Sequence, residues 1–423
     1  MLQRIPKRRA AITVFIALCL TAICGFVALA IDGGVLLDDR QRIQSAVDMA
    51  ALAAAENLFL NWQANQGADP SGTAATKARE SASQNGFPDV PGGVPSKVDV
   101  HIPPQSGPFQ TQPGYAEVII TYSQQRFFSR IWSSDPITVQ VRAVSRGRWV
   151  PFRMGILVLD PTAPGALTNN GGGSMSVIGV PTIVDSNAPD AATATGNGTC
   201  ICSEFDVTGV PGTSGSGTWK GTILSGQAPT PDPLRYLPEP DPSTMVVQSK
   251  NPTHISGTNT TILQPGVYKG GITVTGQGAL VMMPGIYYMD GGGFTFSGQG
   301  GMTANGVMIV NAPSSNGASE VISINGTGAI NFSPPTTGIY AGISLWQVRS
   351  STNTVSVSGN GGQSISGTFY VAGGTLSVTG NGTNDVIGSQ YISDLLTIGG
   401  GGGFSVNWNP QQTARTRLIN LVE

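Results

Sequence analysis

The sequence predicts an N-terminal transmembrane helix, then a small α+β module, then a mainly β domain folded as a right-handed parallel β-helix or β-solenoid. The first of three supporting observations is an uncharged apolar run of 22 residues near the N-terminus. The second is a change of composition near residue 150, after which 47 of the 58 glycines lie. The third is a short template, repeated through the glycine-rich part, of an apolar residue, Ser or Thr, an apolar residue, any residue and Gly.

Composition excludes several classes of protein. Glycine is abundant, which argues against a helical bundle, because each glycine costs a helix about 1 kcal/mol relative to alanine. Only 11% of the 423 residues are charged and the net charge is −2. This low charge argues against a coiled coil, which needs charged flanking positions, and against a nucleic-acid partner, which needs an excess of cations. The 39% of hydrophobic residues argues against disorder.

These features divide the chain into five predicted segments. They are a cytoplasmic basic tail (1–9), a transmembrane helix (10–31), a juxtamembrane helix with a small α+β module (32–150), a Gly-rich β-helical repeat domain (151–410) and a C-terminal tail (411–423).

The apolar run 10–31 reaches about 33 Å as a helix, which is enough to cross a hydrocarbon core of about 30 Å. The cations that precede it are Arg4, Lys7, Arg8 and Arg9. By the positive-inside rule they predict a single pass through the cytoplasmic membrane, with the bulk of the chain extracytoplasmic. The alternative is a cleaved signal peptide, since Ala28-Leu29-Ala30 is similar to a cleavage site.

Beyond the run, apolar residues recur at spacings of three, four and seven over 35–59 and predict an amphipathic helix. A second helix is expected over 73–85. The β-rich stretches 98–102, 115–122 and 137–145 predict strands, with a short helix at 127–132.

The N-terminal pattern carries a family resemblance. A basic stretch leads into the apolar helix and Asp32, and then into a helix with Arg40, Gln44, Asp48 and an Ala-rich segment at 50–55. Residues 8–57 thereby resemble the N-terminal domain of TadG-like proteins of the Tad (Flp) pilus-assembly system, the TadE/G-like family. The resemblance implies that the α+β module is similar to the globular part of a minor pilin.

Internal repeats dominate the rest of the chain. Full copies of the template begin at Ile272, Phe294, Ile322, Val355, Leu376 and Leu396, with weaker copies at Met175 and Phe205. A three-residue strand places its outer two side chains on one face, so the apolar pair points inward and Ser or Thr outward. One turn of about 20 to 30 residues cannot bury that face, but a stack can. Gly-rich turns in an antiparallel β-sandwich remain the alternative.

Certain positions define the repeat. The structural repeat positions are Gly276, Gly298, Gly326, Gly359, Gly380, Tyr268 and Tyr287. The glycines are expected to allow positive φ at tight corners. Stacked amides are expected to form a ladder from Gln277, Gln299, Asn360 and Asn381.

No catalytic, cofactor-binding or metal-binding residue is predicted, and no cofactor. The densest acids (Asp185, Asp190, Glu204 and Asp206) are interpreted as solvated loop residues, and His101 and His254 each stand alone. Some TadG-like proteins carry a von Willebrand A domain with an Asp-x-Ser-x-Ser metal motif. Here GILVLD (155–160) is followed by Pro at the second hydroxyl position, Pro164, which cannot bind a metal. Cys200 and Cys202 form either a local disulfide or free thiols.

The resemblance implies a membrane-anchored envelope protein of bacterial Tad/Flp-type pilus assembly or surface attachment, with a structural or adhesive role. Because the sequence shows no catalytic cluster, no enzyme activity is expected. The expected partners are the lipid bilayer, other Tad pilus or secretion components and a cell-surface glycan, with no nucleic acid. Two alternatives stay open: a surface-anchored lyase or glycosidase acting on polysaccharide from the β-helix, and a glycan-binding module without catalysis.

Overall fold

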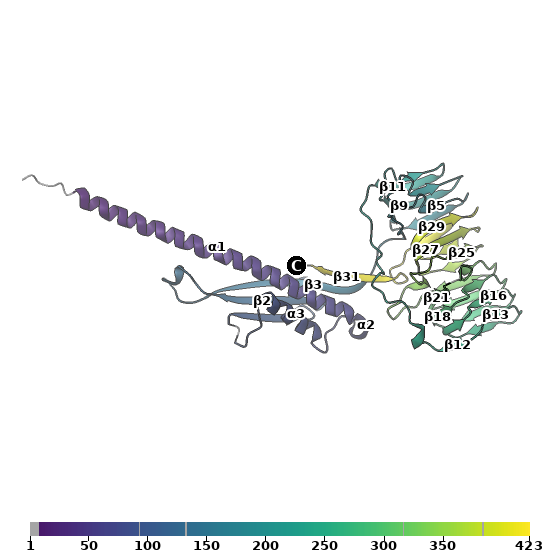
Figure 1. Ribbon diagram of the computed structural model, residues 1–423, viewed down its shortest axis with the longest axis horizontal. Coiled ribbons are helices and arrows are strands. Elements are labelled where there is room, and N and C mark those ends of the chain that lie inside the picture. Colours follow the sequence, from purple (N-terminus) through teal and green to yellow (C-terminus); the bar gives the residue numbers. More distant parts are fainter. Residues whose placement is uncertain (1–7, 93, 132, 316, 383–384) are drawn as a thin grey trace, which may run out of the picture. The chain divides into compact units, whose positions relative to one another are not determined.

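The computed structural model in Figure 1 describes residues 8–92, 94–131, 133–315, 317–382 and 385–423. The chain forms two compact units. The first contains the N-terminal residues to Trp149 together with Arg417–Glu423, and the second contains Val150–Thr416. Each unit is described by itself.

The first unit begins with helix α1 (Arg8–Leu60), which runs through Gly33 and Gly34 without a break. Two further helices follow, α2 (Trp62–Asn65) and α3 (Thr73–Gln84), and then a short 3-10 turn, η1 (Ser129–Ile131). The turn lies inside the short helix expected at 127–132; Trp132 is outside the described residues.

The sheet of this unit has the order β1-β2-β3-β31. Its strands are β1 (Ser96–His101), β2 (Tyr115–Gln124), β3 (Ile137–Pro151) and β31 (Arg415–Leu421). β2 pairs antiparallel with both β1 and β3. The segment 411–423, expected as a C-terminal tail, therefore contains a strand. Its sequence, with alternating cations at Arg415 and Arg417, lacks a continuous apolar run to predict one.

The second half of α1 packs on this sheet through small side chains. Ala50, Ala51 and Ala54 are fully buried in one core with residues of α3 and β2. The hydroxyl of Ser145 on β3 donates to the carbonyl of Ala51 at 2.6 Å. At Gly147, a Cβ atom would lie 1.8 Å from the carbonyl oxygen of Ala55. The helix and the sheet therefore approach so closely that β3 needs glycine there.

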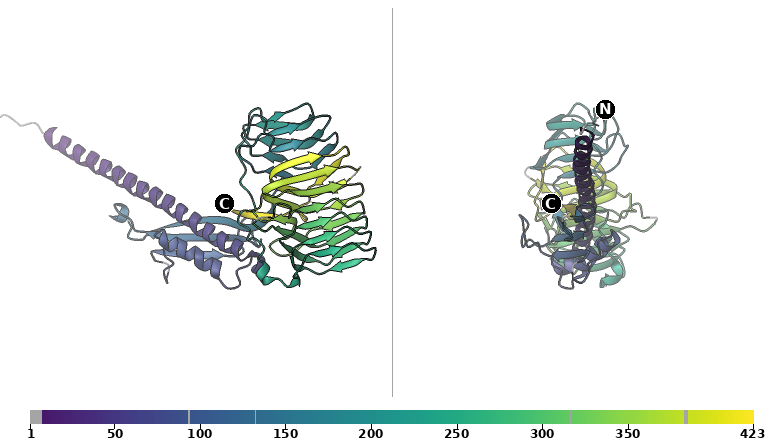
Figure 2. Two further views of the ribbon diagram at one scale, coloured as in Figure 1. Left: turned by 45° about the vertical axis from the view of Figure 1, so that its right-hand side comes forward. Right: turned by 90° about the vertical axis from the view of Figure 1, so that its left-hand side faces the viewer.

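The second unit is a parallel β-solenoid of about 11 turns, which confirms the mainly β fold and excludes the antiparallel sandwich. Each turn contributes a short strand to three faces, and equivalent strands of successive turns pair in parallel (Figure 2). Long strands in two turns, β27 (Thr368–Gly380) and β29 (Gln390–Gly399), pass from face 1 into face 2 with a register shift between Val371 and Thr375.

The strands of each face are given in the order in which they stack. Face 1 contains β12 (Val247–Ser249), β15 (Gly266–Lys269), β18 (Gly285–Asp290), β21 (Val307–Ala312), β24 (Ile343–Gln347), β27, β29, β4 (Ile156–Val158), β7 (Thr182–Val184), the end of β9 (Thr199–Val207) and the end of β11 (Thr218–Ser225). Face 2 contains β13 (Thr253–Ile255), β16 (Ile272–Val274), β19 (Phe294–Phe296), β22 (Ile322–Ile324), β25 (Val355–Gly359), β27, β29, β5 (Leu167–Asn169), β8 (Ala192–Ala194) and β10 (Thr213–Ser214). Face 3 contains β14 (Thr261–Leu263), β17 (Leu280–Met282), β20 (Met302–Asn305), β23 (Ile330–Ser333), β26 (Ser364–Ile365), β28 (Asp385–Ile387), β30 (Phe404–Asn407), β6 (Ser174–Ile178), the start of β9 and the start of β11.

The turns do not stack in sequence order. The chain enters in the middle of the stack at β4 and winds to one end at β11. It then crosses to the opposite end at β12 and winds back until β29 pairs with β4. In Figure 2 the teal turns lie at one end, the green turns at the other, and the yellow last turns between them.

The crossing segment, residues 226–246, is called the strap here; it contains the 3-10 turn η2 (Pro242–Thr244). It lies along face 1 and covers its outer surface. The interior is filled by one long apolar cluster, yet Trp346 and Tyr370, which do not belong to that cluster, are fully buried as well. Leu234 and Leu237 of the strap are also buried. Face 1 is therefore covered by the apolar cluster on its inner side and by the strap on its outer side, whereas a face of a regular solenoid is exposed on its outer side.

Candidate functional site

The first half of α1 presents a continuous apolar surface. From Ile12 to Ile31 its large apolar side chains are exposed, among them Phe15, Leu18 and Phe26. It is the one helix within the described residues that is long and apolar enough to cross a membrane. The buried half of the same helix begins at Ile43. A single helix therefore joins an apolar, unpacked half to a half that is fixed in the protein core.

Asp32 marks the end of this apolar surface and holds a distant loop. Its Oδ1 accepts the backbone N–H of Phe128 at 3.0 Å, and its Oδ2 accepts that of Ser129 at 2.7 Å. These bonds attach the β2–β3 loop to α1 where the apolar run stops.

The acids of the solenoid do not form one site. The interpretation of Asp185 as a solvated loop residue is wrong, because its side chain is buried. The Oδ1 atom of Asp185 accepts the backbone N–H of Thr230 in the strap at 2.8 Å. Burial raises the pKa of this carboxyl to about 6. Glu204 and Asp206 lie on β9 with partial exposure, and burial and Glu204 raise the pKa of Asp206. Asp190 lies in the loop before β8.

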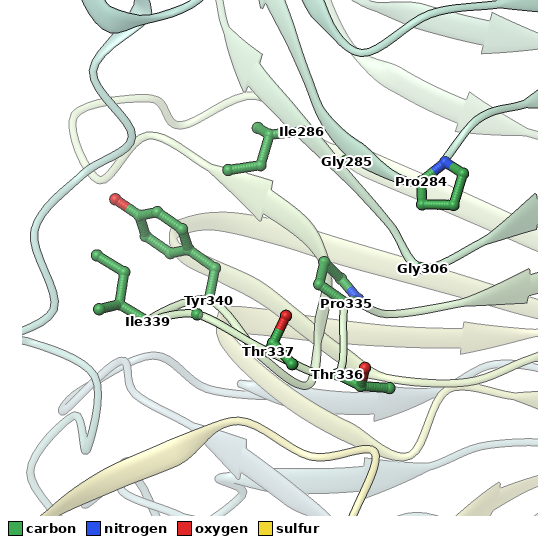
Figure 3. A pocket seen from close by; sticks show the side chains of 10 residues that line it. Pro284, Gly285, Ile286, Gly306, Pro335, Thr336, Thr337, Ile339 and Tyr340 are labelled. Carbon is green, nitrogen blue, oxygen red and sulfur yellow. The ribbon is translucent and has the colours of Figure 1, made fainter. Parts of the chain in front are cut away.

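A pocket of about 380 Å³ opens beside face 1 (Figure 3). It is lined by the segment 335–340 and by Pro284, Gly285, Ile286 and Gly306. The hydroxyl of Tyr340 donates to the carbonyl of Pro238 in the strap at 3.0 Å, and burial raises the pKa of Tyr340 to about 12. Tyr340 is the lone titratable group among the lining residues, so the pocket offers hydroxyls and apolar surface. This pocket was not predicted from the sequence. The feature that could have indicated it is the insertion after β23, which begins with Pro334 and Pro335.

Comparison with protein families finds one match. Residues 10–57 match the family described as "Putative Flp pilus-assembly TadE/G-like". This stretch is similar to a TadE/G-like domain. Comparison with curated proteins and with solved structures finds no match. The TadE/G-like match and the exposed apolar half of α1 together indicate a single-pass membrane anchor in a pilus-related protein.

The residues that carry the TadE/G-like pattern have distinct environments. Gln44 donates to Asp48 at 2.8 Å on the exposed side of α1, while Arg40 is exposed one turn earlier. The Ala-rich segment forms the contact with the sheet. The TadE/G-like domain therefore contains both the anchor and the helix face that fixes it to the α+β module.

The five repeat glycines lie at corners of the solenoid, but none of them has a positive φ. The expected reason for glycine was therefore wrong. A Cβ at Gly276 would lie 2.2 Å from the carbonyl oxygen of Gly257, and one at Gly326 would lie 2.3 Å from the Phe296 ring. Clashes under 3.0 Å also arise at Gly298, Gly359 and Gly380. Close stacking of successive turns, not backbone conformation, requires these glycines.

The two repeat tyrosines stack in the interior. The rings of Tyr268 and Tyr287 lie 5.9 Å apart and nearly parallel. Their hydroxyls donate to backbone carbonyls, that of Tyr287 to Leu263 and Met283. Of the expected amide ladder, Gln277 pairs with Gln299 at 3.4 Å, and Asn381 with Asn360 at 3.5 Å. Thr327 occupies the intervening turn and interrupts the ladder.

Cys200 and Cys202 are free, buried thiols on β9 rather than a disulfide. Residues two apart on a strand point the same way with Cα atoms about 6.6 Å apart, near the upper limit for a disulfide. Cys200 accepts a hydrogen bond from Asn169 at 3.3 Å, and burial raises its pKa to about 11. His101 lies on β1 and His254 on β13. Within the described residues, no three His, Cys, Asp or Glu side chains gather in a metal-binding arrangement.

Proposed function

We propose that this protein is a structural component of Tad-type pilus assembly, anchored in the bacterial inner membrane, with its α+β module and solenoid outside the cytoplasm. The observation that carries the proposal is α1, whose TadE/G-like stretch, residues 10–57, includes both the exposed apolar half and the half packed on the module. The cations before the apolar run set the orientation, because they are retained in the cytoplasm.

The solenoid supplies an extended, weakly charged surface for contact with other pilus or secretion components. Its inward positions are apolar, and its outward strand positions are Ser and Thr, as in β16, β22 and β25. An adhesive role belongs to the same proposal, since such a surface can contact a solid support or another cell. No described contact favours a glycan over a protein as its partner.

Protease protection tests the orientation. We expect protease added to spheroplasts to degrade the solenoid, and alkaline extraction to leave the chain in the membrane. The membrane-bound protein should retain the full mass of 43.6 kDa. A solenoid protected until the membrane is dissolved would overturn the orientation, and a product starting after Ala30 would show a cleaved signal peptide instead of an anchor.

Deletion of the gene in a strain that assembles Tad pili tests the role. We expect fewer surface pili and weaker attachment, both restored by the wild-type chain. Normal piliation together with lost attachment would limit the protein to adhesion. Normal piliation and attachment would reject the proposed function.

A further inference from the structure

The loop between β2 and β3, residues 125–136, exposes large apolar side chains. Phe127 is 73% exposed and Ile131 is 83% exposed, while Phe128 is partly covered. The two phenyl rings meet edge to face with centroids 4.9 Å apart. Three such side chains at one loop tip form an apolar surface whose exposure to water is unfavourable.

This loop lies against the apolar half of α1. Phe128 and Ile131 form one wall of a groove of about 500 Å³, and the helix forms the other. The helical wall consists of Thr21, Ile23, Cys24, Gly25, Val27 and Ala28. The hydrogen bonds from Phe128 and Ser129 to Asp32 hold the loop in this place. In Figure 1 the β2–β3 hairpin extends along α1 toward its N-terminal half.

The depth of the contact follows from helix geometry. Cys24 precedes Asp32 by eight residues, which is about 12 Å along the helix axis. If the apolar run fills the hydrocarbon core, this part of the helix lies inside the bilayer. A loop in contact with it therefore lies within the leaflet, as do interfacial segments that bury their apolar faces to a depth of about 5 to 10 Å.

We propose that the loop segment 125–131 is a second membrane contact, in which Phe127, Phe128 and Ile131 insert into the leaflet at the C-terminal end of the span. The proposal rests on the proposed function, because it needs α1 to cross the bilayer. In the sequence, Arg126 precedes the apolar residues and the exposed Arg130 stands between Phe128 and Ile131. The Nε of Arg126 donates to the carbonyl of Asp135 at 2.8 Å and closes the base of the loop.

Lipid is favoured over a protein partner because the apolar tip continues the lipid-facing surface of the helix. Both surfaces are exposed, and they meet along the groove. The loop also joins the α+β module to the end of the span, since the backbone N–H groups of Phe128 and Ser129 donate to Asp32. A second copy of the chain is the competing occupant.

Spin labels in the full-length protein test this inference. The protein is reconstituted in vesicles of phosphatidylethanolamine and phosphatidylglycerol, in a background with Cys19, Cys24, Cys200 and Cys202 replaced by alanine. Single cysteines are introduced by Leu20→Cys, Phe127→Cys, Ile131→Cys and Thr138→Cys. Relaxation by oxygen, which concentrates in the bilayer, is compared with relaxation by a water-soluble nickel chelate. Thr138, exposed on β3, is the control.

We expect labels at 20, 127 and 131 to favour oxygen and the label at 138 to favour nickel. A label at 20 that favours nickel would reject the anchor itself. A membrane signal at 20 with a water signal at 127 and 131 would reject the loop contact alone. Protection of 127 and 131 from both reagents, lost on dilution into excess lipid, would assign the loop to a second copy.

A measurement on the unmodified chain keeps the proposal testable if a variant fails to fold. Vesicles containing a lipid with a photoactivatable acyl chain are irradiated, and the labelled peptides are identified by mass spectrometry. We expect label on residues 10–31 and on 125–131. Label on 10–31 without label on 125–131 would overturn the loop contact.

Discussion

At the scale of single residues, the repeat glycines allow close approach of the chain and do not serve an unusual backbone conformation. The corner glycines of the repeat admit a neighbouring turn at a distance that a Cβ would block. Gly147 does the same for α1, with its carbonyl contact at Ala55. The sequence predicted where the corner glycines lie, because the template is periodic. It could not predict Gly147, because a single glycine in a strand carries no sign of the helix above it.

Gly147→Val should destabilise the first unit. The added side chain would force α1 away from β3, and overpacking of a core costs about 1 to 3 kcal/mol. The loss is measured as a lower urea midpoint. Gly34→Ala on the exposed side of α1, where nothing lies within 4 Å of an added Cβ, is the control and should not lower the midpoint, because alanine favours a helix over glycine. An unchanged midpoint for Gly147→Val would contradict the close packing.

Asp185 should make solenoid stability depend on pH. Its folded pKa, about 6, lies above the ordinary 3.8, so the folded state holds the proton more tightly than the unfolded state. The cost of the buried charge is absent below pH 3.8 and grows as pH rises to about 6. Asp185→Asn should therefore be more stable than wild type at pH 8, by about 1 to 2 kcal/mol after allowance for solvent screening.

Urea denaturation at pH 4.5 and pH 8 measures this difference. The gain from Asp185→Asn should shrink toward the lower pH. A polysaccharide-cutting activity that Asp185→Asn abolishes would instead revive the enzyme alternative.

At the scale of elements, the strap is the part of the solenoid unit that the repeat pattern did not predict. Its proline-rich sequence has no template copy, so it resembles a loop, although it covers face 1 from one end of the stack toward the other. Arg349 binds it most extensively: its guanidinium donates to the carbonyls of Leu234 and Leu237 and to the Tyr370 hydroxyl. The Tyr370 hydroxyl in turn donates to Asp232 at 2.7 Å.

Arg349→Met should loosen the strap. The substitution leaves two carbonyls without their donor and removes the cation from the Trp346 and Tyr370 rings, a loss of about 2 to 3 kcal/mol. Trypsin cleavage after Arg235, which is exposed in the strap, should become faster. Lys269→Met, which removes an exposed ion pair at 3.7 Å, is the control and should leave cleavage unchanged. Unchanged cleavage in Arg349→Met would show that other contacts hold the strap.

At the scale of the whole molecule, the sequence predicted the parts but not their connections. The membrane helix, the three antiparallel strands and the solenoid strands all follow from local periodicity. The order of the turns does not, because any two copies of the template can pair equally well in a parallel stack. The strand β31 was missed for a related reason: it is half-buried at most positions, and its partner is more than 250 residues away in the sequence.

Removal of residues 417–423 should weaken the four-stranded sheet. The deletion removes the ion pair of Arg142 with Glu423, that of Arg417 with Glu56, and the backbone bond from Val144 to Glu423. We expect a loss of about 2 to 3 kcal/mol and faster hydrogen exchange at the Val144 amide. Glu423→Gln, which removes one charge and leaves the strand, should cost less than about 1 kcal/mol. Protection of Val144 in the truncated chain would show that β31 does not pair with β3.

The mid-stack entry of the chain has a consequence for biosynthesis. The turn formed by β29 and β30 is the last to be synthesised, yet it pairs with β4, β5 and β6 on one side and with β27 and β28 on the other. Until it emerges, the growing chain holds two incomplete stacks, each with open strand edges that can pair wrongly. The domain therefore cannot mature progressively from its first turn. Its assembly ends only when the final residues have left the ribosome and, for an exported chain, crossed the membrane.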